Sequence, residues 1–266
     1  MARLLNKWKA IFIIWLQDAM TYRASLVIWI LPEALNGMLM PLVWIAAGKG
    51  QAIAGFEPSQ FVQYYLVLLT MQGFVVSHMM WDIAFEIKDG IYSVQMLRPI
   101  SYFQFQFFRN LAWRANRTIM FLPFLACLVL FYQSYLHGLN YYWGVDLWIS
   151  VLLGNIVSFS FVLAMAQLAF FVQEAQALFE FYYFPMIFLS GQAFPIAVMP
   201  SWVRSLSPLF PFYYTTGVPT EIAIGKLSGP AAHTAMGIQV VWIAISLVMY
   251  KILMKTGLPK YSGVGM

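Results

Sequence analysis

Two ionisable side chains with the spacing of an acid–base or metal-binding pair stand at the end of an apolar stretch. His78 and Asp82 are four residues apart, so a continuous helix would place them on one face. An imidazole and a carboxylate in that arrangement can bind a metal ion or exchange a proton. No third ligand lies nearby in the sequence, and His137 and His233 are isolated. We therefore predict no metal site and favour a structural hydrogen bond.

A single carboxylate, Glu33, lies inside the first long apolar stretch, directly after Pro32. It is roughly seven residues from the start of that stretch, which is about 10 Å along a helix. An ionisable group at that depth in a membrane is by default a candidate for a substrate path. The alternatives are that Glu33 pairs with a neighbouring helix or reaches to the membrane surface.

The densest group of charges between apolar stretches lies in residues 85–101, which read FEIKDGIYSVQMLRPIS. Charges and unpaired backbone groups each cost several kcal/mol in hydrocarbon, so this segment must lie outside a bilayer or on its surface. We expect a short helix from Glu86 to Leu97 that Gly90 weakens and Pro99 ends. Its apolar face would hold Ile83, Ile87, Ile91 and Val94. A solvated loop is the alternative.

The composition places the chain among membrane proteins. Of its 266 residues, 62% are hydrophobic and 9% are charged, and the mean hydropathy is +0.73. Soluble domains carry about 25% charged residues. The net charge of +5 therefore indicates basic residues kept on the cytoplasmic side of a membrane, and we expect no nucleic-acid partner. The single cysteine, Cys127, excludes an intrachain disulfide.

We predict an all-α polytopic membrane protein that forms one domain over residues 1–266 and crosses the bilayer six times. The predicted spans are residues 26–47, 61–81, 118–135, 147–172, 178–189 and 232–254. Ahead of them, residues 1–22 carry three basic residues among apolar ones at helical spacing, which predicts an interfacial helix in contact with membrane lipid. A signal peptide is the alternative, but the apolar run is short and no cleavage site follows.

Three arginines, Arg109, Arg114 and Arg117, precede the third predicted span. They recur after five and three residues, as anchors at a lipid-headgroup interface would. Contact with an anionic substrate is the alternative.

Prolines interrupt the apolar residues that follow the fifth predicted span. Pro195, Pro200, Pro208 and Pro211 forbid one continuous helix. Broken backbone at membrane depth is tolerated only where it is packed in protein or lines a cavity. We therefore predict short re-entrant helices on the outer side over residues 190–213, with a hydrophobic loop on the membrane surface as the alternative.

Two groups of motifs resemble those of ABC-2 type transporter permeases, the membrane subunits of bacterial ATP-binding-cassette exporters. The first, Glu86-x-x-x-Gly90 followed by Leu97-Arg98-Pro99-Ile100-Ser101, resembles the family's first cytosolic loop. The second resembles the end of the family's membrane domain. It consists of Ser190-Gly191-x-x-Phe194-Pro195, Met199-Pro200-x-Trp202, Leu206-Ser207-Pro208 and Pro211-x-Tyr213. The family usually has a charged residue soon afterwards, and Glu221 fits that position loosely.

The resemblance implies roles for particular residues. Residues 85–101 would form the cytosolic coupling loop, whose helix docks on an ATP-binding subunit. The coupling residues would be Glu86, Gly90, Leu97, Arg98 and Pro99. The substrate path or outer gate would include Ser190, Gly191, Phe194 and Pro195, and we place Glu33 there too.

The same resemblance implies partners. The chain has no G-x-x-x-x-G-K-[ST] motif, so ATP and magnesium would be bound by a separate ATP-binding subunit present in two copies. A second copy of this chain, or a related six-span permease, would complete the complex. Export of a hydrophobic, amphipathic or polymeric substrate across a bacterial inner membrane is expected. An integral membrane enzyme or a channel that needs no ATPase is the alternative function.

The distribution of basic residues predicts the orientation. Of the 15 Lys and Arg, all but Lys49, Arg204 and Lys226 fall in segments that would be cytoplasmic if both termini were inside. Such a bias places both termini, and residues 85–101, in the cytoplasm.

Overall fold

The computed structural model describes residues 2–21, 23–172 and 174–261, of which most are helical and none belongs to a β-strand. Residues 1 and 22 of the predicted interfacial helix lie outside the described residues. The α-helices are α1 (Ala2–Thr21), α2 (Arg23–Gly48), α3 (Pro58–Val75), α4 (Met80–Lys88), α5 (Ile91–Met96), α6 (Tyr102–Phe131), α7 (Gln133–Leu136), α8 (Val145–Ala166), α9 (Ala175–Leu189), α10 (Ser201–Leu206), α11 (Val218–Ala223) and α12 (Gly229–Gly257).

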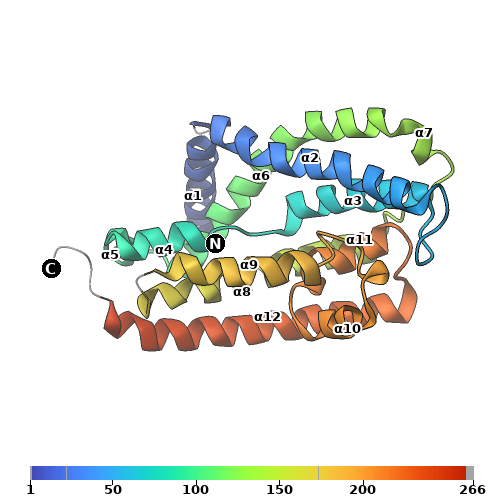
Figure 1. Ribbon diagram of the computed structural model, residues 1–266. Helices are drawn as coiled ribbons and strands as arrows, with labels where there is room; N and C mark the ends of the chain where they lie inside the picture. Colours follow the sequence, from blue (N-terminus) through green and yellow to red (C-terminus); the bar gives the residue numbers. More distant parts are fainter. Residues whose placement is uncertain (1, 22, 173, 262–266) are drawn as a thin grey trace.

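The long helices run side by side along the length of the molecule, and α1 crosses them against α6 (Figure 1). Helix α8 packs along α12, while α3 lies between α2, α6 and α8. The α4–α5 segment and the end of α12 lie at one end, named the α5 end here, and α7 lies at the other, the α7 end (Figure 1). At the α5 end, the Ser93 and Tyr261 hydroxyl oxygens are 3.1 Å apart.

Five helical segments of the described chain are long and apolar enough to cross a membrane. They are Ile30–Gly48, Pro58–Lys88, Tyr102–Phe131, Val145–Phe170 and Gly229–Lys260. The protein is therefore an all-α, multi-pass membrane protein. Helix α9, the fifth of the six predicted spans, has 15 residues. That is about 22 Å at 1.5 Å per residue, less than a hydrocarbon core of about 30 Å, so helix length does not establish a sixth span.

The second predicted span is interrupted. Helix α3 ends at Val75, and the backbone is non-helical until α4 begins at Met80. The prediction that His78 and Asp82 share one helix face is wrong, because His78 lies in this break and Asp82 lies in α4.

Side chains of α6 and α8 satisfy the backbone groups that the break exposes. Arg114 donates to the carbonyl oxygens of Gln72 and Gly73 at 3.3 and 3.2 Å. On the opposite side, Asn155 donates to the Phe74 oxygen at 2.9 Å, and the Ser77 amide donates 2.9 Å to the Ser158 hydroxyl. These bonds replace the helical ones, which makes non-helical backbone tolerable at this depth.

The third span begins earlier than predicted. Helix α6 starts at Tyr102 instead of near Thr118, and the Ser101 hydroxyl caps it by accepting a hydrogen bond from the Gln104 amide at 3.3 Å. The charged residues at its start did not suggest a helix inside the bilayer, but these residues find partners on other helices.

Between α9 and α12, the chain makes only short helical turns, as the prolines predict. These are η2 (Ile196–Val198), α10, η3 (Ser207–Leu209), a π-helical turn η4 (Tyr213–Gly217) and α11. That these turns re-enter the membrane from the outer side stays a prediction.

Candidate functional sites

The segment between the second and third spans folds as two helices. The single helix expected from Glu86 to Leu97 is wrong, because α4 ends at Lys88 and α5 begins only at Ile91. Between them Gly90 has φ 77°, a left-handed conformation that glycine adopts without the steric cost of a side chain. The chain therefore turns sharply at the position where we expected only a weakened helix.

The sharp turn separates the predicted apolar face into a buried half and an exposed half. Ile83 and Ile87 of α4 are buried in the core. Ile91 and Val94 of α5 are 47% and 57% exposed, and Leu97 is 86% exposed. The turn therefore ends in an exposed apolar edge, which consists of Ile91, Val94, Met96 and Leu97.

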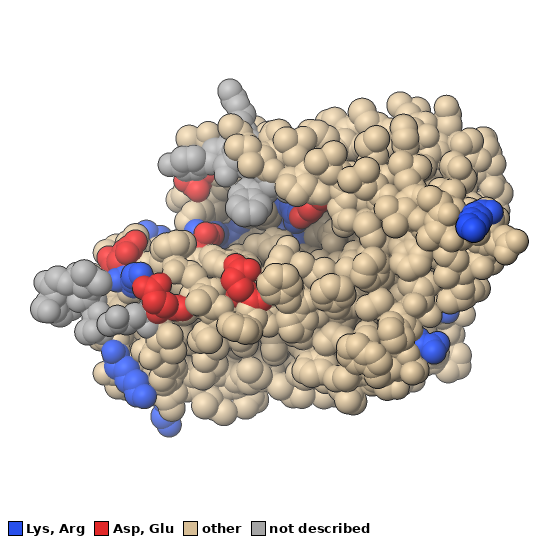
Figure 2. Space-filling model, viewed as in Figure 1, with Lys and Arg blue, Asp and Glu red and all other residues tan. Residues whose placement is uncertain are grey.

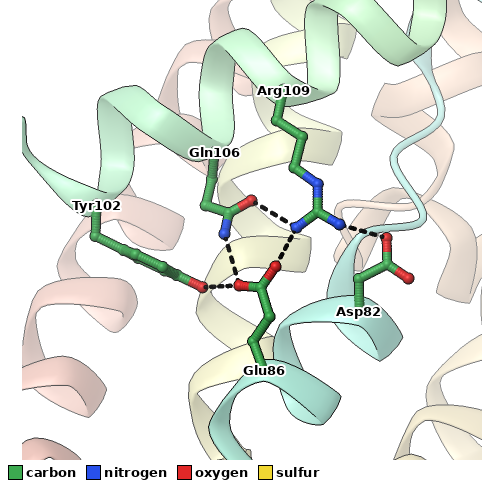
Figure 3. A network of polar contacts seen from close by, with 5 residues as sticks. All are labelled: Asp82, Glu86, Tyr102, Gln106 and Arg109. Atoms are coloured by element: carbon green, nitrogen blue, oxygen red, sulfur yellow. Dashed lines mark hydrogen bonds and ion pairs between the residues drawn. The ribbon is translucent and has the colours of Figure 1, made fainter. Parts of the chain in front are cut away.

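A network of polar contacts joins α4, the helix before this turn, to α6 (Figure 3). Glu86 projects from α4 toward α6, and its carboxylate accepts hydrogen bonds from the Tyr102 hydroxyl at 3.4 Å and the Gln106 amide at 3.2 Å. Arg109 donates to Glu86 through Nη1 and to Asp82 through Nη2, the latter at 3.3 Å. Glu86 is only 8% exposed, so this candidate coupling residue points into the protein.

The three arginines of α6 are not headgroup anchors. Arg109 forms ion pairs with two carboxylates of α4 and lies 4.5 Å from the centre of the Trp15 ring of α1. Arg114 and Arg117 are 5% and 3% exposed, and Arg117 pairs with Glu33 of α2. A guanidinium within a span requires such partners, because leaving it unpaired in hydrocarbon costs several kcal/mol.

Other candidate coupling residues lie where α1 meets the start of α6. The guanidinium carbon of Arg98 lies 4.7 Å from the centre of the Phe105 ring. Lys7 of α1 donates a hydrogen bond to the Pro99 carbonyl oxygen. Helix α1 thus contacts both the end of residues 85–101 and the first turns of α6.

The C-terminal residues support α5 from the other side. Tyr92 is fully buried, and its ring centre lies 5.5 Å from that of Tyr261. Burial, together with the neighbouring Tyr250 and Tyr261, raises the pKa of the Tyr92 hydroxyl above its ordinary value. The hydroxyl therefore stays neutral and holds α5 by packing and by a 3.3 Å contact with the Met254 sulfur.

A cavity of about 340 Å³ opens beside α2 at membrane depth. Its walls come from α2, the break after α3, α6, and α9 with the turn that follows it. It is lined by Pro32, Glu33, Asn36, Met40, Gln72, Val76, His78, Arg117, Tyr183, Ile187, Gln192, Ala193 and Phe194. The space-filling view shows this face hollowed near its middle, with acidic and basic atoms inside the hollow (Figure 2).

The structure brings two of the predicted path residues, Glu33 and Phe194, into this cavity. Ser190 and Pro195 are buried and are not among its lining residues. Gly191 adopts φ 85°, and its carbonyl oxygen accepts a 2.8 Å hydrogen bond from Tyr64 of α3. Ser190, Gly191 and Pro195 thus belong to a buried turn and Phe194 lines the cavity, and that these residues form a substrate path or outer gate stays a prediction.

Several residues of these sites escaped prediction. Tyr102, Gln106 and Arg109 recur after four and three residues, which is the spacing of one helix face, and Asp82 and Glu86 have the same relation on α4. These two polar helix faces, with complementary charges, were the feature of the sequence from which the network could have been predicted. Tyr64 and Tyr65 hold the turn after α9 by donating to the carbonyl oxygens of Gly191 and Ala193. The sequence contains no signal for these bonds, because every residue has a backbone carbonyl.

The remaining ionisable candidates lie apart from both sites. His233 is not isolated, since its Nε2 lies 3.6 Å from the Asp146 carboxylate at the α7 end. Glu221, the loosely matched residue, accepts a hydrogen bond from the Tyr213 hydroxyl at 2.6 Å. The described residues contain no group of three or more His, Cys, Asp or Glu that could hold a metal ion.

Comparison with known proteins agrees with this architecture. A family model described as "ABC-2 family transporter protein" matches residues 34–265, which include residues 85–101 and the broken segment after α9. No curated protein and no solved structure matches the chain. Because the family model covers most of the chain, the protein belongs to the ABC-2 family of transporter membrane proteins.

Proposed function

We propose that this chain is the permease subunit of an ABC exporter and that a separate ATP-binding subunit docks on the exposed apolar edge of α5. The observation that carries the proposal is the combination of that edge with the polar network that joins α4, the helix before the turn, to α6. Leu97, at 86%, is the most exposed large apolar side chain of the described residues. Apolar side chains presented together by one short helix are a typical surface for a partner's groove.

The polar network between α4 and α6 can carry a movement of the partner into the membrane. Arg109 joins α6 to both Asp82 and Glu86 of α4, so α4 and the first turns of α6 should move together. Helix α1 contacts the same part of α6 through Lys7 and Trp15. Closure of the ATP-binding dimer would shift α1, α4 and the first turns of α6 together as a rigid body. Because α3 ends at the break, this shift can occur relative to α3, and it would open a path.

The finer features of the assembly follow from the family. We propose two ATP-binding subunits, which hold ATP and magnesium, and a second permease copy or a related permease. The α5 end would face the cytoplasm of a bacterial cell and the α7 end would face outward. Three of the twelve basic residues assigned to the cytoplasmic side, Arg109, Arg114 and Arg117, lie inside α6 and no longer count for orientation. The remaining nine still outnumber the three on the other side.

Substitution of Leu97 by glutamate tests the docking surface. A carboxylate placed at the centre of an apolar contact should disrupt association, because its desolvation is not compensated. We expect Leu97→Glu to reduce ATP-binding subunit co-purified with the tagged chain by about ten-fold or more, which corresponds to about 1.4 kcal/mol.

Val145→Glu is the matched control. Val145 is an apolar residue that is 72% exposed at the α7 end, so its substitution introduces the same charge far from the proposed contact. We expect it to leave co-purification unchanged. An equal loss in both variants, or a full yield of ATPase with Leu97→Glu, would refute docking at α5.

A further inference from the structure

The cavity beside α2 contains a buried guanidinium with an unused donor. Arg117 lines the cavity, and its Nη2 donates to Glu33. Its Nη1 is buried and has no hydrogen-bond partner among the described residues, and only 3% of the residue is exposed. A charged donor without an acceptor in a low-dielectric region costs free energy, so an acceptor that reaches it is bound favourably.

The described charges around this cavity do not balance. Arg114 is buried beside Arg117 on α6, and it bonds only to neutral oxygens, those of Gln72, Gly73 and Asn110. Its Nη2 also has no partner in the described part of the chain. Two buried guanidiniums therefore share one carboxylate, that of Glu33. An additional anion would offset the excess positive charge.

The rest of the lining suits an amphipathic molecule. Apolar contacts are available from Met40, Val76, Ile187, Ala193 and Phe194, and neutral polar groups come from Asn36, Gln72, His78, Tyr183 and Gln192. The volume of about 340 Å³ is near the lower end of the range of roughly 300–1,000 Å³ for small-molecule sites. It has room for a headgroup and the first part of an apolar chain.

We propose that this cavity binds the anionic headgroup of an amphipathic molecule, which bonds to Arg117 in place of Glu33. A phosphate or carboxylate with an attached apolar chain has the required chemistry. The side chain of Glu33 is 31% exposed, so it can turn into the open part of the cavity when an anion replaces it. Binding of the headgroup does not depend on the proposed transport function. Only the inference that the bound molecule is the transported substrate rests on it.

The exchange predicts opposite effects of the two members of the ion pair. Glu33→Gln removes the competing carboxylate and leaves Arg117 free, so it should tighten binding of an anionic amphiphile by about ten-fold. Arg117→Gln removes the main donor and should weaken binding by about ten-fold or more. A purely structural ion pair would give losses of similar size in both variants.

The test uses the full chain in nanodiscs of zwitterionic lipid, with dodecyl phosphate as the probe and displacement of the radiolabelled probe as the measurement. Lys251→Gln, which removes an exposed positive charge from α12, is the control and should leave affinity unchanged. The double variant Glu33→Gln/Arg117→Gln carries no unpaired charge at either position, so it remains informative if Arg117→Gln alone does not fold. We expect it to bind as weakly as Arg117→Gln.

Three results would overturn the proposal. One is weaker probe binding in Glu33→Gln together with normal binding in the double variant, which is the behaviour of a structural pair. Another is displacement by inorganic phosphate at the concentration at which dodecyl phosphate displaces, which would indicate a site for a free anion. The third is stronger binding of dodecyltrimethylammonium than of dodecyl phosphate, together with loss of that binding in Glu33→Gln. This result would indicate a site in which Glu33 binds a cationic headgroup.

Failure of this inference is distinguishable from failure of the proposed function. Probe binding is measured on the purified chain and needs no ATPase. An ATPase that co-purifies with a chain unable to bind dodecyl phosphate would overturn only the headgroup site. Specific probe binding without any associated ATPase would instead overturn the proposed function.

Discussion

Arg109 joins two carboxylates of α4 to α6, so the loss of a single side chain from this network should affect the stability of the protein. The side chains of Arg109 and Glu86 are 18% and 11% exposed, so the pair is largely removed from water. Removing one member of a fully buried pair costs about 3–5 kcal/mol, whereas exposed pairs contribute about 0–1 kcal/mol. Tyr102 and Gln106 also bond to Glu86, so its carboxylate is the centre of the network.

We expect Glu86→Gln to lower the free energy of unfolding by about 1–3 kcal/mol, since an amide carries no charge to pair with Arg109 and has only one acceptor oxygen for the three donors that contact Glu86. The measurement is the thermal unfolding midpoint of the detergent-solubilised chain. Lys88→Gln provides a comparison, because the Lys88–Glu174 pair is also an ion pair, at 3.0 Å, but has side chains that are 43% and 71% exposed. The network would have no structural importance if both variants shifted the midpoint equally.

The orientation of α5 relative to α4 depends on the backbone conformation of one residue, Gly90. Any residue with a Cβ must adopt φ near 77° there at a cost of about 1–2 kcal/mol. Proline, whose φ is fixed near −65°, cannot adopt it at all. Substitution therefore acts by reorienting α5 relative to α4, and not by breaking a continuous helix.

Gly90→Ala should destabilise the chain modestly and reduce the stimulation of ATPase activity by the permease. Gly138→Ala is the matched control, because Gly138 has φ 76° in a loop at the α7 end, and a Cβ added there would meet no atom within 4 Å. We expect both to lower the unfolding midpoint similarly, while only Gly90→Ala impairs ATPase stimulation in reconstituted membranes. Normal stimulation with Gly90→Ala would show that the angle between α4 and α5 has no part in coupling.

The sequence was informative about which elements exist and less so about where they begin and break. Apolar stretches and the prolines after α9 predicted the helical class and the interrupted segment correctly. The break at residues 76–79 had no local signal, because the bonds that stabilise it come from Arg114, Asn155 and Ser158 on other helices. The early start of α6 was missed for the same reason.

Candidate site residues were predictable only where one short motif contains them. Glu86, Gly90 and Leu97 were found because they lie in a single loop, although the side chain of Glu86 points inward and that of Leu97 outward. The cavity combines Glu33, Arg117 and Phe194 from three distant segments. Their proximity is a property of the packing of α2, α6 and the turn after α9, and local spacing does not encode it.

At the scale of the whole molecule, the direction of the helices bears on the number of membrane crossings. Helices α8 and α12 start together, since Asp146 and His233 are 3.6 Å apart at the α7 end. Both run toward the α5 end, where Met254 contacts Tyr92. The chain must return between them, and α9 with the turns that follow it is the segment that does so. We therefore expect six crossings, although α9 is short.

Single cysteines test this expectation in a Cys127→Ser background. The positions are Lys260 at the α5 end and Val145 at the α7 end. A membrane-impermeant maleimide should label Val145→Cys in intact cells, and should label Lys260→Cys only after the membrane is opened. Labelling of Lys260→Cys from outside would mean that α9 does not return the chain across the bilayer.

The partners of Arg114 and Arg117 all precede these arginines in the chain. Glu33 lies on α2, the carbonyl oxygens of Gln72 and Gly73 lie near the end of α3, and Asn110 lies one turn earlier. During synthesis, α2 and α3 leave the ribosome before α6, so both guanidiniums meet their acceptors on arrival in the bilayer. An arginine at the centre of an inserting helix costs about 2.5–3.5 kcal/mol. The acceptors on α2 and α3 offset this cost, because they are already in the bilayer when α6 inserts. Helix α6 can thus integrate beside α2 and α3 before α8 to α12 have been made.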